Sequence, residues 1–343
     1  MVDSSFFGRA LAAVARHGVL RHAADRLARL DAAFARRFAP GAADPVAPAA
    51  GEGPVVLPSV PPTVAPFLTF TPPGHFYSPV PDMADIGARA DRLFATPRDL
   101  PGVDLHAAEQ LDLFRTLAAL ARDAPLPEVP GTEGRYGVEN PNYGIGDASM
   151  LQAMLRHVRP VRYLEVGSGY STALALDTNE RYLGGAMFVT AIEPHPELLR
   201  DVTRPGDRLE VIDEPVQEVP IERFRALSDG DVLFVDCSHV LKTGSDVQHL
   251  YTNVLPVLAP GVHVHVHDIF WPFEYLRHWV EAGRAWNEAY VLHAFLLFNE
   301  AFEIVLWNHY LALEHRGVVE AELPGMLETP GGAIWLRRKP AGD

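Results

Sequence analysis

Acidic and histidine side chains gather directly after two apolar segments in the second half of the chain. One segment ends in Asp236-Cys-Ser-His239, and the next ends in His267-Asp268. A histidine at either place can remove a proton from a substrate hydroxyl, because the pKa of histidine lies near working pH. Asp236, His239 and Asp268 are also ligand types for a divalent metal ion, which lowers the pKa of a bound hydroxyl.

Three interpretations of these residues stay open. In the first, His239 or His267 is a general base. In the second, Asp236, His239 and Asp268 hold Mg²⁺, Mn²⁺, Fe²⁺ or Zn²⁺. In the third, the two acids cap helices and the histidines are packing residues. We favour a catalytic or metal-binding function for His239, His267 and Asp268, and packing for the two histidines deeper in the second segment, which alternate along one strand face with His267.

A glycine-containing loop lies where the first predicted strand turns into a helix. It begins at Glu165 and reads Glu-Val-Gly-Ser-Gly-Tyr-Ser-Thr. Gly167 and Gly169 allow a tight turn and a close approach to a ligand, and the helix start at Ser171 offers free N–H groups. Glu193 ends the second predicted strand and can accept the ribose hydroxyls of a nucleoside. The pattern therefore predicts a nucleoside cofactor.

Two details favour S-adenosylmethionine (SAM) over a dinucleotide. The loop lacks the third glycine of a dinucleotide fingerprint, because Thr172 follows Ser171. Glu165 would repel a pyrophosphate, whereas its carboxylate suits the cationic amino group of the methionine part. Cys237 is interpreted as a small buried residue, since methyl transfer from a sulfonium is a direct displacement and needs no protein nucleophile.

The loop resembles that of the class I SAM-dependent methyltransferases. Three segments resemble one bacterial subgroup of that class: FTPPGHFYSP from Phe70, FVDCSHV from Phe234 and HVHDIF from His265. The resemblance covers roughly residues 67–340. Some class I O-methyltransferases place metal-binding acids after the fourth and fifth strands. The resemblance implies methionine contacts near the glycine loop, a ribose contact at Glu193 and an adenine contact near Gln217. The cofactor-binding candidates are Glu165, Gly167, Ser168, Gly169, Ser171, Glu193, Gln217 and Asp236.

Alternating apolar strands and helices indicate the fold that must position these residues. They predict a Rossmann-like, seven-stranded, mostly parallel sheet with helices on both faces and an antiparallel edge hairpin. The predicted strands are 161–166, 187–192, 209–212, 231–235, 262–266, 302–307 and 333–337. The predicted helices are 83–95, 106–123, 147–157, one from residue 171, 196–202, 246–258 and 288–298.

The chain divides by composition into four predicted parts. Residues 1–38 form an amphipathic helical segment, and 39–66 a linker rich in Pro and Ala. An extended arm and helical cap span 67–146, where aromatic residues such as Phe70, Phe76 and Tyr77 should pack on another surface. The SAM-binding domain spans 147–343. We predict that the Arg-rich N-terminal helix can join copies of the chain into a homo-oligomer.

Composition limits the classes of partner and compartment. The net charge of -15 argues against nucleic acid as the main partner. The single cysteine excludes an intrachain disulfide and favours a reducing cytoplasm. The chain has no apolar run long enough to span a membrane and does not begin like a signal peptide. These features predict a cytoplasmic protein with a small-molecule substrate.

We therefore expect a SAM-dependent methyltransferase that acts on a small molecule, such as a sugar or a natural-product intermediate. O-methylation is expected, assisted by a base or a metal ion. Two alternatives remain: an oxidoreductase with a nucleotide cofactor of the NAD type, and a non-catalytic SAM-binding assembly protein.

Overall fold

The computed structural model describes residues 64–96, 99–131 and 134–340. By its internal contacts the chain divides into two compact units, residues 1–65 and residues 66–343. The predicted N-terminal helical segment, most of the predicted linker and the predicted homo-oligomer contact lie outside the described residues. The fold below is that of the second unit.

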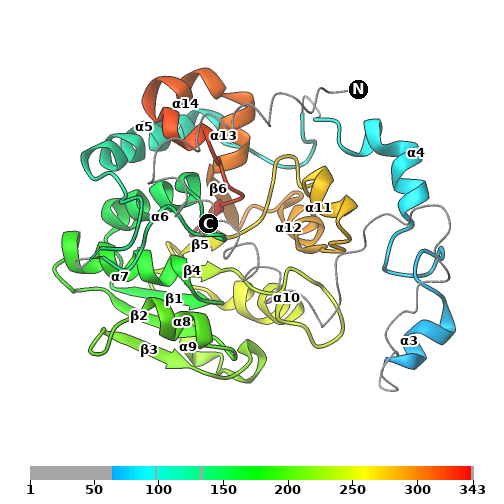
Figure 1. The fold of residues 1–343 in the computed structure, drawn as a ribbon, viewed down its shortest axis with the longest axis horizontal. Helices are drawn as coiled ribbons and strands as arrows, with labels where there is room; N and C mark the ends of the chain where they lie inside the picture. The colour runs from blue at the N-terminus through cyan, green and yellow to red at the C-terminus, as the bar shows by residue number, and fades with distance from the viewer. Residues whose placement is uncertain (1–63, 97–98, 132–133, 341–343) are drawn as a thin grey trace, which may run out of the picture. The chain divides into compact units, whose positions relative to one another are not determined.

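The second unit contains a seven-stranded sheet with the strand order β3-β2-β1-β4-β5-β7-β6 (Figure 1). Strands β1 to β5 pair in parallel, and β7 pairs antiparallel with both β5 and β6. Each strand begins and ends within one residue of its predicted range, so the strand predictions are confirmed. The strands are β1 (Arg162–Val166), β2 (Phe188–Ile192), β3 (Leu209–Ile212), β4 (Val232–Val235), β5 (His263–Val266), β6 (Phe302–Trp307) and β7 (Ile334–Arg338).

The antiparallel strand pair lies at the edge of the sheet, as predicted, but a tight turn does not join its members. Two helices, α13 (Asn308–Glu314) and α14 (Arg316–Glu322), separate β6 from β7 along the chain. Strand β7 then inserts between β5 and β6. Because β7 runs against both neighbours, the edge strand β6 points the same way as β1 to β5.

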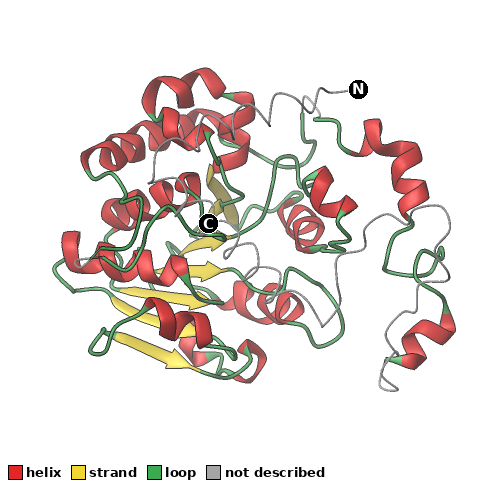
Figure 2. Cartoon of the chain, viewed as in Figure 1, coloured by secondary structure: helices red, strands yellow, loops and turns green. Residues whose placement is uncertain are grey.

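Helices flank the sheet on both faces (Figure 2). All of β4 is buried, as is β1 after its first residue, which requires cover on both sides of the sheet. The remaining helices of the sheet region are α5 (Ala107–Asp123), α6 (Ile145–Val158), α7 (Tyr170–Tyr182), α8 (Glu197–Val202), α9 (Glu222–Arg225), α10 (Asp246–His249), α11 (Arg277–Glu281) and α12 (Glu288–Leu296). Single helical turns are η1 (Val216–Glu218), η2 (Leu250–Val254), η3 (Leu255–Val257) and η4 (Pro324–Leu327).

Helix α6 packs against both α5 and α7. Phe114 and Leu117 of α5 are fully buried and belong to the same hydrophobic core as the strands. Helix α5 lies in the predicted cap and α6 in the predicted domain, yet the two share one core. The domain boundaries at residues 66 and 146 stay predictions.

The segment before α5 differs from its prediction in two ways. It contains a short helix, α3 (Ala65–Phe70), which ends before the Pro-Pro pair that follows it, because proline cannot continue a helix. Phe70, Phe76 and Tyr77 are 80%, 88% and 68% exposed, so they do not pack against the described part of the chain, and packing on another surface stays a prediction. The rings of Phe76 and Tyr77 instead contact each other locally, with centroids 5.0 Å apart. The predicted helix at 83–95 is present as α4 (Met83–Leu93).

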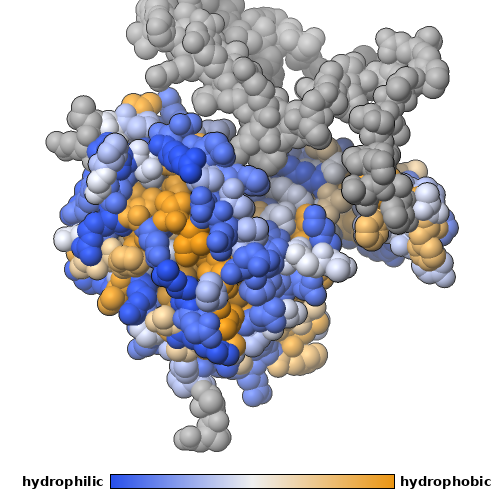
Figure 3. All heavy atoms as spheres, turned by 90° about the horizontal axis from the view of Figure 1, so that it is seen from below, coloured by the Kyte–Doolittle hydropathy of each residue, from blue (hydrophilic) through white to orange (hydrophobic). Residues whose placement is uncertain are grey.

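Strand β3 forms one free edge of the sheet. Glu210 on this strand pairs with Arg223 at 2.7 Å, and a charged side chain at an edge disfavours pairing with another chain. The view from below in Figure 3 shows a largely hydrophilic surface interrupted by apolar patches. Among the described residues, none of the helices has the length and apolar character needed to span a membrane.

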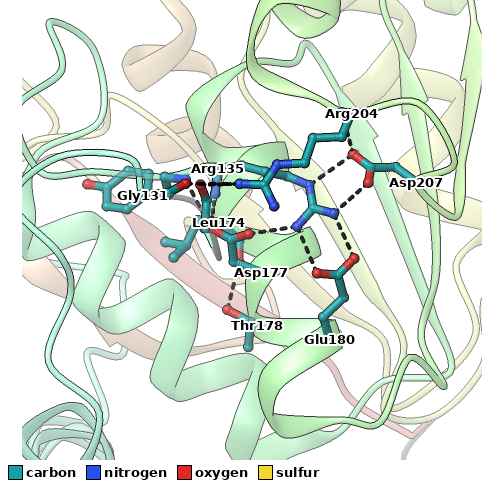
Figure 4. A network of polar contacts seen from close by, with 10 residues as sticks. Gly131, Arg135, Leu174, Asp177, Thr178, Glu180, Arg204 and Asp207 are labelled. Atoms are coloured by element: carbon teal, nitrogen blue, oxygen red, sulfur yellow. Dashed lines mark hydrogen bonds and ion pairs between the residues drawn. The ribbon is translucent and has the colours of Figure 1, made fainter.

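A buried arginine ties the loop before α6 to helix α7 (Figure 4). The Arg135 guanidinium pairs with Asp177 at 2.7 Å, Glu180 at 2.6 Å and Asp207 at 2.5 Å. Asp177 also accepts hydrogen bonds from the backbone N–H groups of Arg135 and Tyr136. Because Arg135, Asp177 and Asp207 are all nearly excluded from solvent, this network fixes the loop that leads into α6.

We predict that Arg135→Met lowers the free energy of unfolding by about 3–5 kcal/mol, because Asp177 and Asp207 would remain buried without their cation. Urea unfolding near neutral pH measures the change. Arg89 pairs with Asp85 on the surface and provides the control. Arg89→Met should cost less than about 1 kcal/mol, since exposed ion pairs contribute little.

The effect of Arg135→Met should depend on pH. Burial raises the pKa of Asp207, but the hydrogen bond from Arg135 and the nearby charges outweigh it and hold the pKa below 3.8. The hydrogen bond from Arg135 likewise lowers the pKa of Glu180 below 4.5. A lowered carboxyl pKa gives stability that is present above the unfolded value and is lost as the pH falls through the folded value. The difference between wild type and variant should therefore shrink at acid pH, and a difference that persists unchanged at about pH 3 would contradict this account.

Candidate functional site

The carboxyl ends of β1, β4 and β5 lie side by side at one edge of the sheet. The backbone N–H of Asp236, after β4, donates to the carbonyl oxygen of Val166 at the end of β1. The N–H of His267, after β5, donates to the carbonyl oxygen of Val235 at the end of β4. Ligands of parallel sheets bind at this edge, so the residues that follow these three strands form the candidate site.

The glycine loop after β1 touches the backbone of the loop after β4. Gly167 has a φ of 83°, and a Cβ atom there would lie 1.7 Å from the carbonyl oxygen of Asp236. A Cβ atom on Gly169 would lie 2.8 Å from a methyl carbon of Leu198. Glycine is therefore required at Gly167 by both backbone conformation and space.

Glu165 lies beneath the loop and is fully buried. Its two carboxylate oxygens accept hydrogen bonds from the hydroxyls of Ser171 and Thr172, each at 2.5 Å. Burial raises the pKa of Glu165 to about 8, although these two hydrogen bonds oppose the shift. The carboxylate thus supports the first turn of α7 from inside the fold. Its predicted contact with the methionine amino group stays a prediction.

Glu193 follows β2 and lies beside the glycine loop. Its Oε2 accepts a hydrogen bond from the Ser168 hydroxyl at 3.3 Å, and its Oε1 accepts one from the backbone N–H of His195. The side chain is only half-buried, so it can reach a ligand. Gln217, in η1, donates to the carbonyl oxygen of Gly244 at 2.8 Å. The loop after β3 is thereby joined to the segment before α10.

Asp236, His239 and Asp268 come together after β4 and β5. His239 Nε2 lies 3.3 Å from Asp236 Oδ1 and 3.5 Å from Asp268 Oδ2. One ligand atom from each residue lies within 4.8 Å of the others, and no second such group of metal-ligand types occurs among the described residues. Within the described structure, neither acid accepts a hydrogen bond from a backbone N–H, so the helix-capping interpretation has no support.

The backbone at two of these residues is in the left-handed region. His239 has a φ of 59° and Asp268 a φ of 58°. This conformation costs about 1–2 kcal/mol for a residue with a Cβ atom. Such backbone strain occurs preferentially at functional sites, where the surrounding structure enforces it.

Acidic side chains outnumber histidines in the cluster. Glu288 of α12 joins it, with Oε2 2.9 Å from His239 Nδ1. Burial opposes a charge on His239, but hydrogen bonds to Asp236 and Glu288 and the nearby Asp268 outweigh it and raise the pKa of His239 well above 6.5. Three acidic side chains therefore lie around the His239 ring, and His267 is a second histidine beside Asp268. Unbalanced buried charge is unfavourable, and a cation at the cluster would reduce the imbalance.

His267 lies between two acids at the end of β5. Its Nε2 is 3.7 Å from Asp268 Oδ1 and 3.9 Å from Asp147 Oδ2. Burial opposes its charge, but Asp268, Asp236 and Asp147 outweigh burial and raise its pKa above 6.5. By contrast, the deeper His265 is fully buried and stacks on Phe234 with centroids 3.9 Å apart, and burial lowers its pKa. His265 thus occupies a packing position.

Sequence analysis did not single out three of the residues around this site. Glu288 and Tyr251 contact the cluster from segments distant in the chain, and Asn308 donates to Asp147 at 2.9 Å. Glu288 could be recognised only as an acid in the first turn of a predicted helix, a common position for a solvated acid. The sequence carries no local signal that this acid is buried.

The comparisons with known proteins agree with this geometry. Residues 164–269 match the model of a family described as a methyltransferase domain. A protein of Archaeoglobus fulgidus, described as uncharacterized, is 32% identical over an alignment of 166 residues. The alignment covers 46% of this chain and 74% of that protein. The matched residues include the glycine loop and β2 to β5, so this part of the chain is similar to a methyltransferase domain, and the strand order and glycine loop agree with a Rossmann-like methyltransferase.

Two solved methyltransferase structures are among those similar to this chain. The SAH-bound methyltransferase PaMTH1 of Podospora anserina is 15% identical, covers 75% of this chain and 95% of its own, and has a TM-score of 0.39. The O-methyltransferase TomG of Streptomyces achromogenes, in complex with SAM, is 16% identical, covers 76% and 97%, and has a TM-score of 0.34.

We predict that Gly167→Ala abolishes detectable binding of S-adenosylhomocysteine (SAH), because the added Cβ atom would push the glycine loop away from Asp236. Calorimetric titration with SAH measures binding, and urea unfolding measures stability. Gly184 also has a positive φ, of 65°, but a Cβ atom there would meet nothing within 4 Å. Gly184→Ala should therefore cost only about 1 kcal/mol of stability and keep SAH binding. Normal SAH binding by Gly167→Ala would contradict this account of the loop.

Proposed function

We propose that the chain transfers the methyl group of SAM to an oxygen atom of a small molecule. One observation carries the proposal: Gly167 of the cofactor loop packs directly against the carbonyl oxygen of Asp236, the first residue of the acidic cluster. SAM held by the loop would therefore lie beside the acidic cluster, which is proposed to activate the hydroxyl group that accepts the methyl group. In-line transfer is fast when donor and acceptor are held close and aligned.

Residues of the first three strand ends are proposed to bind SAM. Glu193 accepts the ribose hydroxyls, and its hydrogen bond from Ser168 keeps it oriented toward the glycine loop. Gln217 lies near the adenine. The start of α7, with Gly169 and Ser171, faces the methionine part, and Glu165 holds that helix start in place.

Asp236, His239 and Asp268 are proposed to hold a divalent metal ion. The fit rests on the donor set of two carboxyl groups and one imidazole nitrogen, on their convergence, and on the additional acid Glu288 beside His239. When bound, the ion would lower the pKa of an acceptor hydroxyl and orient it. The chain itself contributes the ligands and the backbone conformations that bring them together.

A general base without metal is the less supported mechanism. The acids around them raise the pKa of both His239 and His267 despite burial. A raised pKa leaves a smaller fraction of the imidazole in the neutral form, and only the neutral ring can remove a proton from the acceptor. His267 is therefore proposed to orient Asp268 from the side of β5, where its ring lies 3.7 Å from that carboxylate.

Aromatic side chains next to the cluster support a small organic acceptor. The Trp286 ring lies 4.5 Å from the His239 ring, centroid to centroid. The Arg284 guanidinium lies over the rings of both Trp286 and Trp279, and these cation–π contacts hold the two rings in place. A sugar or a ring of a natural-product intermediate can pack on aromatic rings of this kind. The acidic chain is poorly suited to nucleic acid.

We expect SAM and SAH, but not NAD, to raise the melting temperature. Glu193→Ala should weaken SAH binding by about 10- to 100-fold, because two ribose hydroxyls would lose a charged acceptor. Calorimetric titration measures the affinity. Glu197→Ala is the control, since Glu197 is an exposed acid at the start of α8. A melting shift with NAD alone would end the methyltransferase proposal.

We expect methyl transfer to hydroxylated small molecules to stop when EDTA is added and to return with excess divalent metal. Asp268→Asn should lower the rate by at least about 100-fold, because it removes a charged ligand, while SAH affinity changes by less than about 3-fold. Transfer of labelled methyl groups from SAM to a panel of acceptors measures the rate. Transfer that EDTA leaves unchanged would refute the metal-assisted mechanism but not SAM binding.

A further inference from the structure

Glu288 contacts both the ring and the main chain of His239. Its Oε2 lies 2.9 Å from His239 Nδ1, and its backbone N–H donates to the His239 carbonyl oxygen at 3.1 Å. The neighbouring N–H of Asn287 donates to the same oxygen at 3.0 Å. Because the Glu288 side chain is fully buried, water cannot replace it as the partner of the ring. The first turn of α12 thus fixes His239 in place.

The contact with Glu288 determines which ring nitrogen faces the cluster. A carboxylate can only accept a hydrogen bond, so the shared proton belongs to Nδ1 of His239. Nε2 is then the nitrogen directed at Asp236 and Asp268, at 3.3 Å and 3.5 Å. Histidines that ligate metals commonly donate their other N–H to a carboxylate, which fixes the ring and makes the ligating nitrogen a stronger donor.

Other side chains immobilise this pair. The Tyr251 hydroxyl donates to Glu288 Oε1 at 3.2 Å, so both oxygens of the carboxylate are engaged. Tyr251 is itself buried, and the Trp286 ring packs on His239. Glu288 and the His239 ring are therefore oriented before any ligand arrives, which is what a site needs to bind one ion tightly.

Resting on the proposed function, we propose that Glu288 is a positioning residue that presents His239 Nε2 as the nitrogen ligand of the metal ion. The site then selects a first-row transition ion such as Fe²⁺, Co²⁺ or Zn²⁺ over Mg²⁺. Imidazole suits these transition ions, whereas Mg²⁺ prefers oxygen ligands and retains several waters.

Titration of the full-length chain with Co²⁺ and with Mg²⁺, followed by calorimetry and by the visible absorption of Co²⁺, tests the proposal. Wild type should bind Co²⁺ at least about 10-fold more tightly than Mg²⁺. Glu288→Gln should weaken Co²⁺ binding by about 10- to 100-fold, change the Co²⁺ absorption spectrum and affect Mg²⁺ less. The ratio of the two affinities should therefore fall, which a general loss of stability would not produce.

Two further variants separate positioning from folding. Tyr251→Phe removes only the donor to Glu288 and should weaken Co²⁺ binding to a smaller extent, so it serves even where Glu288→Gln fails to fold. Asp246→Asn is the matched control. Asp246 accepts hydrogen bonds from the N–H and hydroxyl of Ser238, in the same loop as His239, without contacting the His239 ring. This variant should keep both affinities.

The outcomes distinguish this inference from the proposed function. Unchanged Co²⁺ affinity and absorption in both Glu288→Gln and Tyr251→Phe overturn the role of Glu288 and leave the metal site standing. Tighter binding of Mg²⁺ than of Co²⁺ by wild type overturns the selectivity. Binding of neither ion overturns the metal site itself, whereas SAH binding tests the cofactor site independently.

Discussion

The close approach of Gly167 to the carbonyl oxygen of Asp236 is the contact on which the rest of the site depends. It joins the loop after β1 to the loop after β4 through main-chain atoms alone. The parallel order of β1, β4 and β5 brings three strand ends to one edge of the sheet, but only the absence of a side chain at Gly167 lets two of the loops touch. The cofactor loop and the acidic cluster therefore form one site rather than two.

Two buried charge networks in the fold differ in how they are balanced. At Arg135, three acids also surround one cation, but Glu180 is half exposed, and the charge of Arg204 further stabilises Asp207. Around His239, the third acid, Glu288, is fully buried. The first network is complete within the chain and holds a loop against α7. In the second, Asp236, Asp268 and Glu288 lie against His239 and the adjacent His267, and a bound cation would offset the excess of acidic side chains.

The sequence predicted the strands well because most are short, largely apolar segments bounded by polar residues, as at Val232–Val235. It also brought Asp236, His239 and Asp268 together, since residues that follow neighbouring parallel strands must meet. It could not reveal Glu288, which is 49 residues from His239 along the chain. A contact between residues so far apart in the chain depends on how α12 packs, and no periodic pattern in the sequence indicates that packing. For the same reason, the exposure of Phe70 could not be read from its aromatic character.

Regular backbone and strained backbone occupy different parts of this fold. The strands are regular apart from a register shift between Ile304 and Leu306 and carry mostly apolar side chains, whereas His239 and Asp268 adopt left-handed conformations in the loops beyond them. Strain of about 1–2 kcal/mol at each residue persists because the surrounding contacts enforce it, as α12 does for the main chain of His239. The regular sheet and the strained loops thus place separate requirements on the sequence. A side chain in these loops can change the chemistry of the site while the order and register of the strands stay the same.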